Sequence, residues 1–221
     1  MITLAELKLG ARQRADMEQS NVVEDAELTQ YINQSISFLH DLMLTAYGDE
    51  YAIASYQFTT TAGQSDYDLP MGFYKLKGVD VSFRAGTYKT LEPFNFNERN
   101  RMQNTPFNYG NARYRILGNK LVFSPVPDKS APVQVWYTPV STMLVDDADV
   151  LTDLNQFSEL VMVDAAIKML VKQEYDPSAL MAQKNELVQR ITIMAQNRDI
   201  GSPMTVTDVY ASNNWPSEDW E

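Results

Sequence analysis

The sequence predicts an α+β fold: a helical platform with an inserted antiparallel β-rich region and an extended C-terminal arm. Three observations carry this prediction. Apolar residues recur at helical spacing in the first and last parts of the chain, the middle is rich in Tyr and Pro with alternating polarity, and the final residues show no periodicity. We therefore divide the chain into N-terminal helices (1–50), an inserted β-rich region (51–145), a C-terminal helix hairpin (146–200) and an arm (201–221).

The N-terminal part is expected to form two helices. Thr3 and Glu6 have the spacing of a capping box, so a short helix should run from about residue 4 to 16. A second helix should begin near Asp25 and end before Gly48, which suits the left-handed position after a helix. Its apolar stripe consists of Leu28, Tyr31, Ile32, Ile36, Leu39, Leu42, Met43 and Ala46.

The middle part is expected to be mostly strand and turn. The clearest hairpin places Gly118-Asn119 between two alternating segments. A strand at 133–137 is expected to be the third strand of the same sheet. The other expected elements are strands at 51–58, 73–83 and 88–91, an extended segment at 67–70 and a short helical turn at 95–103.

The C-terminal part is expected to be a pair of antiparallel helices. One should span about 155–174. Asp176-Pro177 should end it, because Pro177 suits the first turn of a following helix that continues to Gly201. The short break makes the two helices neighbours.

Composition excludes several classes of protein. The 221 residues carry a net charge of −11 and no cysteine, which argues against a sequence-specific nucleic-acid binder and excludes thiolate chemistry. No apolar run approaches the ~18–20 residues of a membrane span, and no signal peptide is evident. We expect no membrane partner.

Catalytic and metal sites are not indicated. His40 is the single histidine and has no partner histidine or cysteine for a metal site. Asp146, Asp147 and Asp149 suit a solvated linker better than a cation site, because no EF-hand pattern surrounds them. A glycosidase-type carboxylate pair stays open, but nothing favours it. We expect no enzyme activity, no catalytic residue, no metal and no cofactor.

One region reverses the charge of the chain. Between Ser82 and Ser124 there are seven basic residues and two acidic ones, a local net charge of +5 with aromatic residues interleaved. An ordinary solvated hairpin surface, contact with an acidic face of a neighbouring copy, and nucleic-acid contact all fit this pattern. The residues assigned to the contact with a neighbouring copy are Arg99, Arg101, Arg113 and Arg115.

The C-terminal arm is the strongest hint of a partner. It holds four acidic residues, no Lys or Arg, and two tryptophans within the last seven residues. So short a segment cannot bury them itself, so it is either a disordered terminus or an arm that orders on a partner. We favour the arm, with Tyr210, Trp215, Glu218, Asp219 and Trp220 as the residues that contact the partner.

A series of motifs in order resembles the head-to-tail adaptor (connector, or head completion) proteins of tailed bacteriophages. The motifs cover nearly the whole chain. They are Arg12-x-Arg14-x-Asp16, Asp25-x-Glu27-Leu28-x-x-Tyr31-Ile32-Asn33, Tyr67-Asp68-Leu69-Pro70-x-x-Phe73-Tyr74-Lys75-Leu76, Tyr114-Arg115-Ile116-Leu117-Gly118-Asn119, Leu121-x-Phe123-Ser124-Pro125-x-Pro127, Tyr137-x-Pro139 and a helix from near Leu154.

The resemblance implies a structural virion protein, assembled in the host cytoplasm. It would form a ring, usually of twelve copies, between a portal protein and a tail or nozzle protein. The arm residues would then contact the portal, and the four arginines would contact a neighbouring subunit or the tail. Genomic DNA would pass through its lumen without specific binding, and an acidic wall suits that passage because it repels phosphate. Two alternatives stay open: another tail-completion or tail-tube protein, and a virion-associated hydrolase with paired carboxylates.

Overall fold

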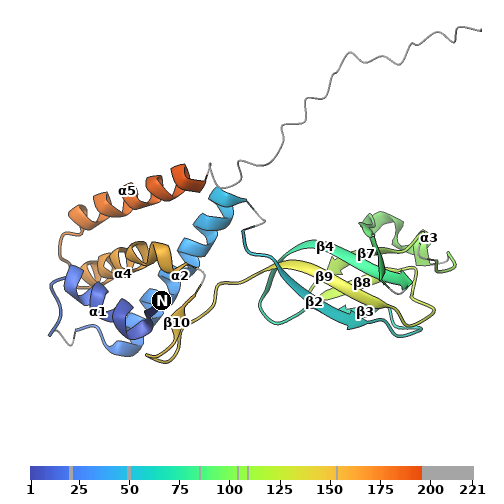
Figure 1. Cartoon of the computed structure of the whole chain (residues 1–221), viewed down its shortest axis with the longest axis horizontal. Coiled ribbons are helices and arrows are strands. Elements are labelled where there is room, and N and C mark those ends of the chain that lie inside the picture. The colour runs from blue at the N-terminus through green and yellow to red at the C-terminus, as the bar shows by residue number, and fades with distance from the viewer. Residues whose placement is uncertain are drawn as a thin grey trace, which may run out of the picture.

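The protein consists of a helical body and a β body that lie end to end (Figure 1). The structure is a computed structural model, and it describes residues 1–19, 22–48, 51–84, 86–103, 105–108, 110–152 and 154–195. Each body has its own hydrophobic core. The α+β prediction is confirmed, and the arm lies outside the described residues.

Within the described residues, four helices make up the helical body (Figure 1). They are α1 (Leu4–Arg14), α2 (Asp25–Tyr47), α4 (Ser158–Lys172, preceded by the 3₁₀ turn Asn155–Phe157) and α5 (Ser178–Ala195). The predicted capping box is confirmed: the Thr3 hydroxyl accepts from the Glu6 N–H at 3.2 Å, and the Thr3 N–H donates to the Glu6 carboxylate at 2.8 Å. Gly48 follows α2 with a φ of +81°, in the left-handed region that glycine tolerates best.

The core of the helical body is built around α4, which packs against α1, α2 and α5. The apolar stripe predicted for α2 supplies much of this core. Fully buried side chains from three helices include Leu7, Leu28, Ile32, Leu39, Leu160 and Met169. Helix α5 lies on the outside, and Ile191 is the buried residue among its described side chains.

A two-stranded sheet connects the N-terminus to the segment that returns from the β body. Strand β1 (Ile2–Thr3) pairs antiparallel with β10 (Val150–Leu151), and the Leu4 N–H donates to the Asp149 carbonyl at 2.9 Å. The sequence did not indicate these strands, because two residues are too few to show an alternating pattern.

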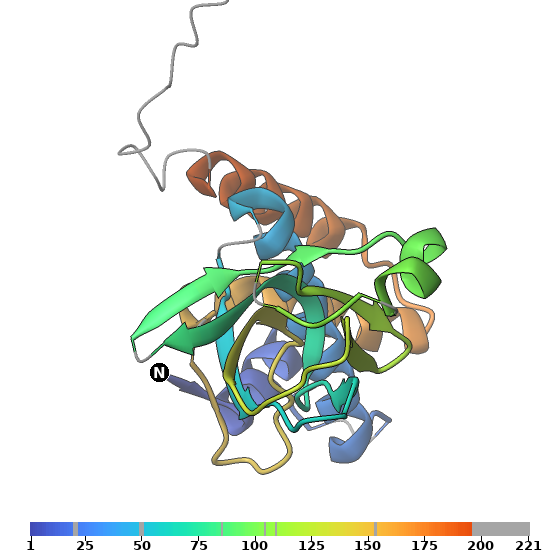
Figure 2. The ribbon, with the colours of Figure 1, turned by 90° about the vertical axis from the view of Figure 1, so that its right-hand side faces the viewer.

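The described part of the β body contains two four-stranded sheets that curl around one core (Figure 2). The first has the order β2-β9-β4-β5: Ala54–Thr59, Pro132–Pro139, Phe73–Arg84 and Thr87–Thr90. The second has the order β3-β8-β7-β6: Asp66–Asp68, Lys120–Ser124, Arg113–Leu117 and Glu92–Pro93. The 3₁₀ turn Phe96–Glu98 and α3 (Arg99–Gln103) lie at the far end of the body, where a short helical turn was expected.

One predicted strand pairing is wrong. The hairpin β7–β8 forms around Gly118 as expected, but β9 is not the third strand of its sheet. It lies between β2 and β4 in the other sheet. Alternation correctly places Val133 and Val135 in the core, but it does not determine which strand lies alongside, because either sheet offers an apolar face to the same core.

Two smaller differences concern β2 and β6. Strand β2 begins at Ala54 rather than Tyr51, whose ring packs on Tyr47 with centroids 5.2 Å apart. Strand β6 pairs with β7 in the parallel direction, so the β region is antiparallel except at this short pair.

Side-chain contacts join the two bodies at their junction. The Asn33 amide clamps the returning segment: it donates to the Leu144 carbonyl at 2.8 Å and accepts from the Leu144 N–H at 2.9 Å. Ser37 and Ser141 share a hydrogen bond of 2.9 Å. These contacts hold the base of the β body against α2.

Candidate interaction surfaces

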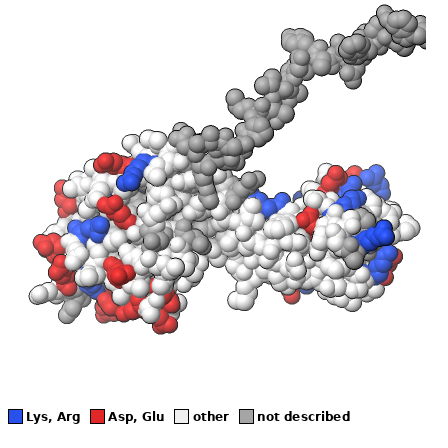
Figure 3. All heavy atoms as spheres, viewed as in Figure 1, with Lys and Arg blue, Asp and Glu red and all other residues white. Residues whose placement is uncertain are grey.

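The four predicted contact arginines lie together at the far end of the β body. Arg99 and Arg101 come from α3, while Arg113 and Arg115 come from β7. Figure 3 shows blue side chains gathered at this end and red ones spread over the helical body. The structure therefore brings together residues that are up to 16 positions apart in the sequence.

The ring of Phe96 organises two of these arginines. The Arg99 guanidinium carbon lies 4.5 Å from its centroid, and that of Arg115 lies 5.9 Å from it. Each group also donates to a carbonyl: Arg99 to Phe96 at 3.1 Å and Arg115 to Phe94 at 2.8 Å. These partners carry no formal charge, so they orient the two cations without neutralising them.

The other two arginines each pair with one of the opposing carboxylates. Arg101 contacts Glu98 at 2.9 Å, and Arg113 contacts Glu92 at 3.1 Å. The Arg101 side chain keeps 78% of its surface exposed, so this pair contributes little to stability. With both acids paired, the positive charge of Arg99 and Arg115 dominates the end of the β body.

Charge is divided between the two bodies. Residues 51–145 hold ten basic and six acidic side chains, a net +4, whereas residues 1–50 and 146–200 together hold eight basic and nineteen acidic ones, a net −11. The molecule therefore presents an acidic helical body and a basic far end of the β body (Figure 3). We call this end, with Arg99, Arg101, Arg113 and Arg115, the basic β tip. Copies packed so that tip meets platform would attract one another.

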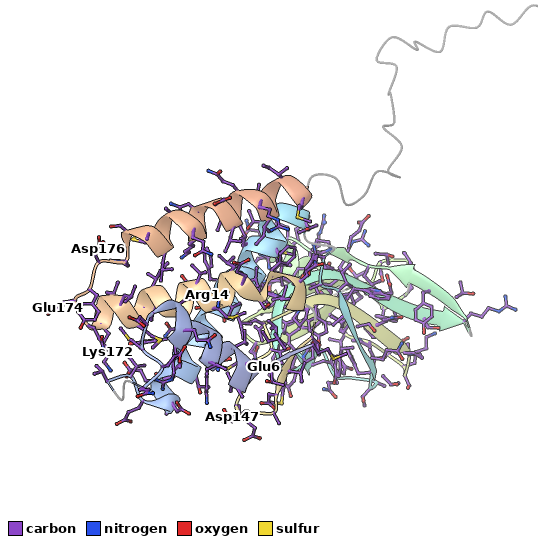
Figure 4. All side chains as sticks on the ribbon, turned by 60° about the vertical axis from the view of Figure 1, so that its left-hand side comes forward. Glu6, Arg14, Asp147, Lys172, Glu174 and Asp176 are labelled. Atoms are coloured by element: carbon purple, nitrogen blue, oxygen red, sulfur yellow. The ribbon has the colours of Figure 1, made fainter. Side chains whose placement is uncertain are left out.

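The acidic surface includes the turn between α4 and α5. Figure 4 shows Lys172, Glu174 and Asp176 together at this turn. The Lys172 ammonium pairs with Glu27 on α2, and Glu27 also accepts from the Tyr31 hydroxyl at 2.6 Å. Hydrogen bonding to this carboxylate raises the pKa of Tyr31 to about 12.

The predicted acidic linker is partly structured. Asp147 pairs with Lys8 of α1 at 2.6 Å, and the Asp149 carboxylate accepts from the N–H groups of Val145 and Asp146 at 2.7 and 2.9 Å. The two backbone hydrogen bonds lower the pKa of Asp149. Within the described residues, no cluster of three metal-ligating side chains is found.

His40 lies at the junction between the bodies. It is 8% exposed, and its ring meets Tyr74 edge-on with centroids 6.5 Å apart. A cavity of about 80 Å³ beside it is lined by residues from α2 and the returning segment, and its described lining contains no Asp or Glu. This geometry gives His40 a packing role and offers no carboxylate pair at this cavity.

A buried polar network, which the sequence analysis missed, fixes α5 to the helical body. The Asp164 carboxylate accepts from Ser35 of α2 at 2.6 Å, from Lys168 at 2.9 Å and from Lys184 of α5 at 2.7 Å. Burial alone would raise the pKa of Asp164, but hydrogen bonds from Lys184, Ser35 and Lys168 outweigh it and hold the pKa below its usual value. An acid on the buried face of an amphipathic helix was the signal available in the sequence.

The arm residues Tyr210, Trp215, Glu218, Asp219 and Trp220 lie outside the described residues. The part of the chain that the structure describes ends at Ala195 of α5. Among the described residues, no helix is long and apolar enough to cross a membrane.

A family model described as the SU10 adaptor protein matches residues 2–207, which includes both bodies. The chain belongs to the SU10 adaptor protein family. Membership indicates a phage structural adaptor protein and a component of the virion, which interacts with other phage head and tail proteins. A comparison with curated proteins finds no match.

Proposed function

We propose that this adaptor joins the portal to the tail: copies of the chain form a ring around the path of the genomic DNA. The match of residues 2–207 to the SU10 adaptor family carries this proposal, because it spans the platform and the β body together. The division of charge between these bodies supports contact between oppositely charged surfaces, of neighbouring copies or of a copy and the tail. Twelve copies is the number we propose for the ring.

The proposed structural units are the segments into which we divided the chain from its sequence. Residues 1–50 and 146–200 act as one helical platform, residues 51–145 project from it, and residues 201–221 form the arm. The separate hydrophobic cores of the two bodies support this division.

The basic β tip is the proposed contact with an acidic surface of a neighbouring copy or of the tail. Arg99 and Arg115 are preoriented by Phe96, so little side-chain entropy is lost when they pair. Their charges meet no carboxylate in the contacts described above, and the platform of a neighbouring copy supplies many.

The arm is the proposed portal contact. Tyr210, Trp215 and Trp220 would be its aromatic anchors, and Glu218 and Asp219 would add charge. Its composition supports this role, because two tryptophans and four acids without a basic residue suit capture by a partner better than self-burial.

Mixing the purified protein with portal rings of the same phage tests the proposal. Electron microscopy should show an added ring on one face of the portal, with a central channel. Removing residues 201–221 should leave a folded protein that no longer sediments with portals. A Trp215→Ala, Trp220→Ala variant should also lose binding, whereas undiminished binding of both variants would reject the arm.

The same experiment separates the alternatives. Binding to tail assemblies but not to portals would identify a tail-completion or tail-tube protein. A virion hydrolase would degrade purified cell wall, and we expect no such activity, because the SU10 adaptor family is structural.

A further inference from the structure

Strand β2 is an open and uncharged edge of the first sheet. No Asp, Glu, Lys or Arg occurs from Tyr51 to Ser65, and Ser55, Tyr56 and Gln57 are all exposed. Monomeric proteins usually protect an edge of this length with a charge, a proline or a bulge, because it can pair with another strand. None of these protections occurs within β2 itself.

The register identifies the backbone groups that face outward. Thr60, just beyond β2, donates its N–H to the carbonyl of the residue opposite it, Ala131, at 2.9 Å. Antiparallel hydrogen bonding alternates along a strand, so Phe58, Tyr56 and Ala54 bond to β9 in the same way. The intervening residues are Ser55, Gln57 and Thr59, and their N–H and C=O groups point away from β9. Within the described residues, these groups have no backbone hydrogen-bond partner on the outward side.

The opposite edge of the sheet is β5, which also has backbone N–H and C=O groups that point away from the sheet, but fewer of them. Leu91 donates its N–H to the carbonyl of Val79, which lies opposite it in the continued register, at 2.8 Å. By the same alternation, Tyr88 and Thr90 direct their backbone groups outward. Strand β5 carries one charge, Lys89, so the two edges do not repel each other.

The order of the sheet makes the two edges compatible. Neighbouring strands in β2-β9-β4-β5 are all antiparallel, so β2 and β5 run in opposite directions. When two copies lie side by side in the same orientation, β5 of one is therefore antiparallel to β2 of the next. Such a head-to-tail contact repeats from copy to copy and can close into a ring.

We propose that β2 of each copy pairs antiparallel with β5 of the next copy, so that the first sheet continues between subunits. Tyr88 and Thr90 would each exchange two main-chain hydrogen bonds with outward-facing residues of β2, about four bonds per interface. This inference rests on the proposed ring and names the surface through which its copies meet. It places the basic ends of neighbouring β bodies side by side, so the acidic surface that they contact is that of the tail.

Engineered disulfides test the pairing, because the chain has no cysteine of its own. Residues in a hydrogen-bonded antiparallel pair have Cα atoms about 5.5 Å apart, within the range that a disulfide bridges. Two registers place Tyr88 opposite either Gln57 or Thr59. Oxidising assembled Gln57→Cys, Tyr88→Cys protein, or Thr59→Cys, Tyr88→Cys protein, should give a ladder of covalent multimers from one of the two.

The single-cysteine variants are the controls, and they should stay monomeric on denaturing gels. Dimers of Gln57→Cys alone would indicate β2–β2 pairing and overturn the proposal. Rings on portals without cross-links in either register would also overturn it, while leaving the portal-to-tail function intact. If no ring forms on portals at all, both proposals fail.

A proline at Gln57 tests the hydrogen bonds directly. Gln57→Pro removes an outward N–H and no bond to β9, and edge strands tolerate such a proline. Gln57→Thr is the matched control, because it keeps the N–H and favours strand. Sedimentation should show self-association at least ~10-fold weaker for the proline variant, with an unchanged thermal midpoint. Equal association of the two variants would refute the pairing; if the proline variant does not fold, the cysteine pairs decide.

Discussion

Removal of the Asp164 charge should strongly destabilise the helical body. Asp164→Asn keeps the size of the side chain but leaves Lys168 and Lys184 facing a neutral amide. Only 7% of the Asp164 side chain is exposed, so its three hydrogen bonds form largely out of water. The loss should fall mainly on α5, because Lys184 joins it to α4 and few of its other side chains are buried.

The expected magnitude follows from the geometry. Removing one partner of a buried ion pair typically costs about 3–5 kcal/mol, because the remaining charge is left uncompensated. Each lysine side chain is 27% exposed, so both can turn toward solvent and recover part of that loss. We therefore expect the free energy of unfolding to fall by about 2–3 kcal/mol, below or at the lower end of that range.

Urea unfolding at pH 7, followed by circular dichroism, measures this change. Glu186→Gln, an exposed carboxylate on α5, is the matched control and should change stability by less than ~0.5 kcal/mol. A double-mutant cycle with Lys184→Met should give a coupling of about 1 kcal/mol or more. A stability loss for Asp164→Asn no larger than that of the control would refute the network as the anchor of α5.

The pH dependence of stability tests independently whether ionised Asp164 stabilises the fold. The pKa of Asp164 is lower in the folded protein than the ~3.9 of an unfolded aspartate, so ionised Asp164 stabilises the fold above that value. This contribution is lost as the pH falls through the folded pKa. The difference in stability between wild type and Asp164→Asn should therefore be constant above about pH 5 and shrink below about pH 4.

Four further predictions concern other parts of the molecule. Arg113→Glu with Arg115→Glu should weaken assembly more at low salt than at ~1 M salt, where the Debye length is about 3 Å; equal loss at every salt concentration would indicate misfolding instead. His40→Ala should preserve assembly and infectivity, and the wild-type protein should not bind duplex DNA measurably at ~0.15 M salt; a salt-sensitive micromolar affinity would contradict the passive channel. Asn33→Ala should lower stability by about 1–3 kcal/mol, because it leaves the N–H and C=O of Leu144 without the amide clamp. Asn33→Asp turns an acceptor oxygen toward the Leu144 carbonyl, so it should not restore the thermal midpoint of the wild type.

Local signals in the sequence determined most of the secondary structure. The capping box at Thr3, the stripe of α2 and the Gly118 turn each act over a few residues, so their outcomes did not depend on distant neighbours. The break at Pro177 behaved in the same way, and α5 begins immediately after it at Ser178.

The candidate surfaces were predictable in composition but not in arrangement. The sequence showed an excess of arginine around the hairpin, and the structure showed that Phe96 orients Arg99 and Arg115 while Glu98 and Glu92 pair with the other two. The contact of the Phe96 ring with Arg99 is local, whereas its contact with Arg115 of β7 depends on how the chain folds back, which no spacing rule encodes.

By itself, the sequence determined the helices, most of the strands, the hairpin and the local reversal of charge, because propensity, periodicity and capping act between near neighbours. Tertiary structure alone decided that β9 lies between β2 and β4, that β1 pairs with β10, and that Asp164 joins three helices. The physical reason is the same in each case: an alternating strand or a buried carboxylate needs a partner, but any partner of suitable shape and charge satisfies that need. The three-dimensional path of the chain selects one partner for each. It therefore also decides that β2 and β5 are the edge strands of the first sheet.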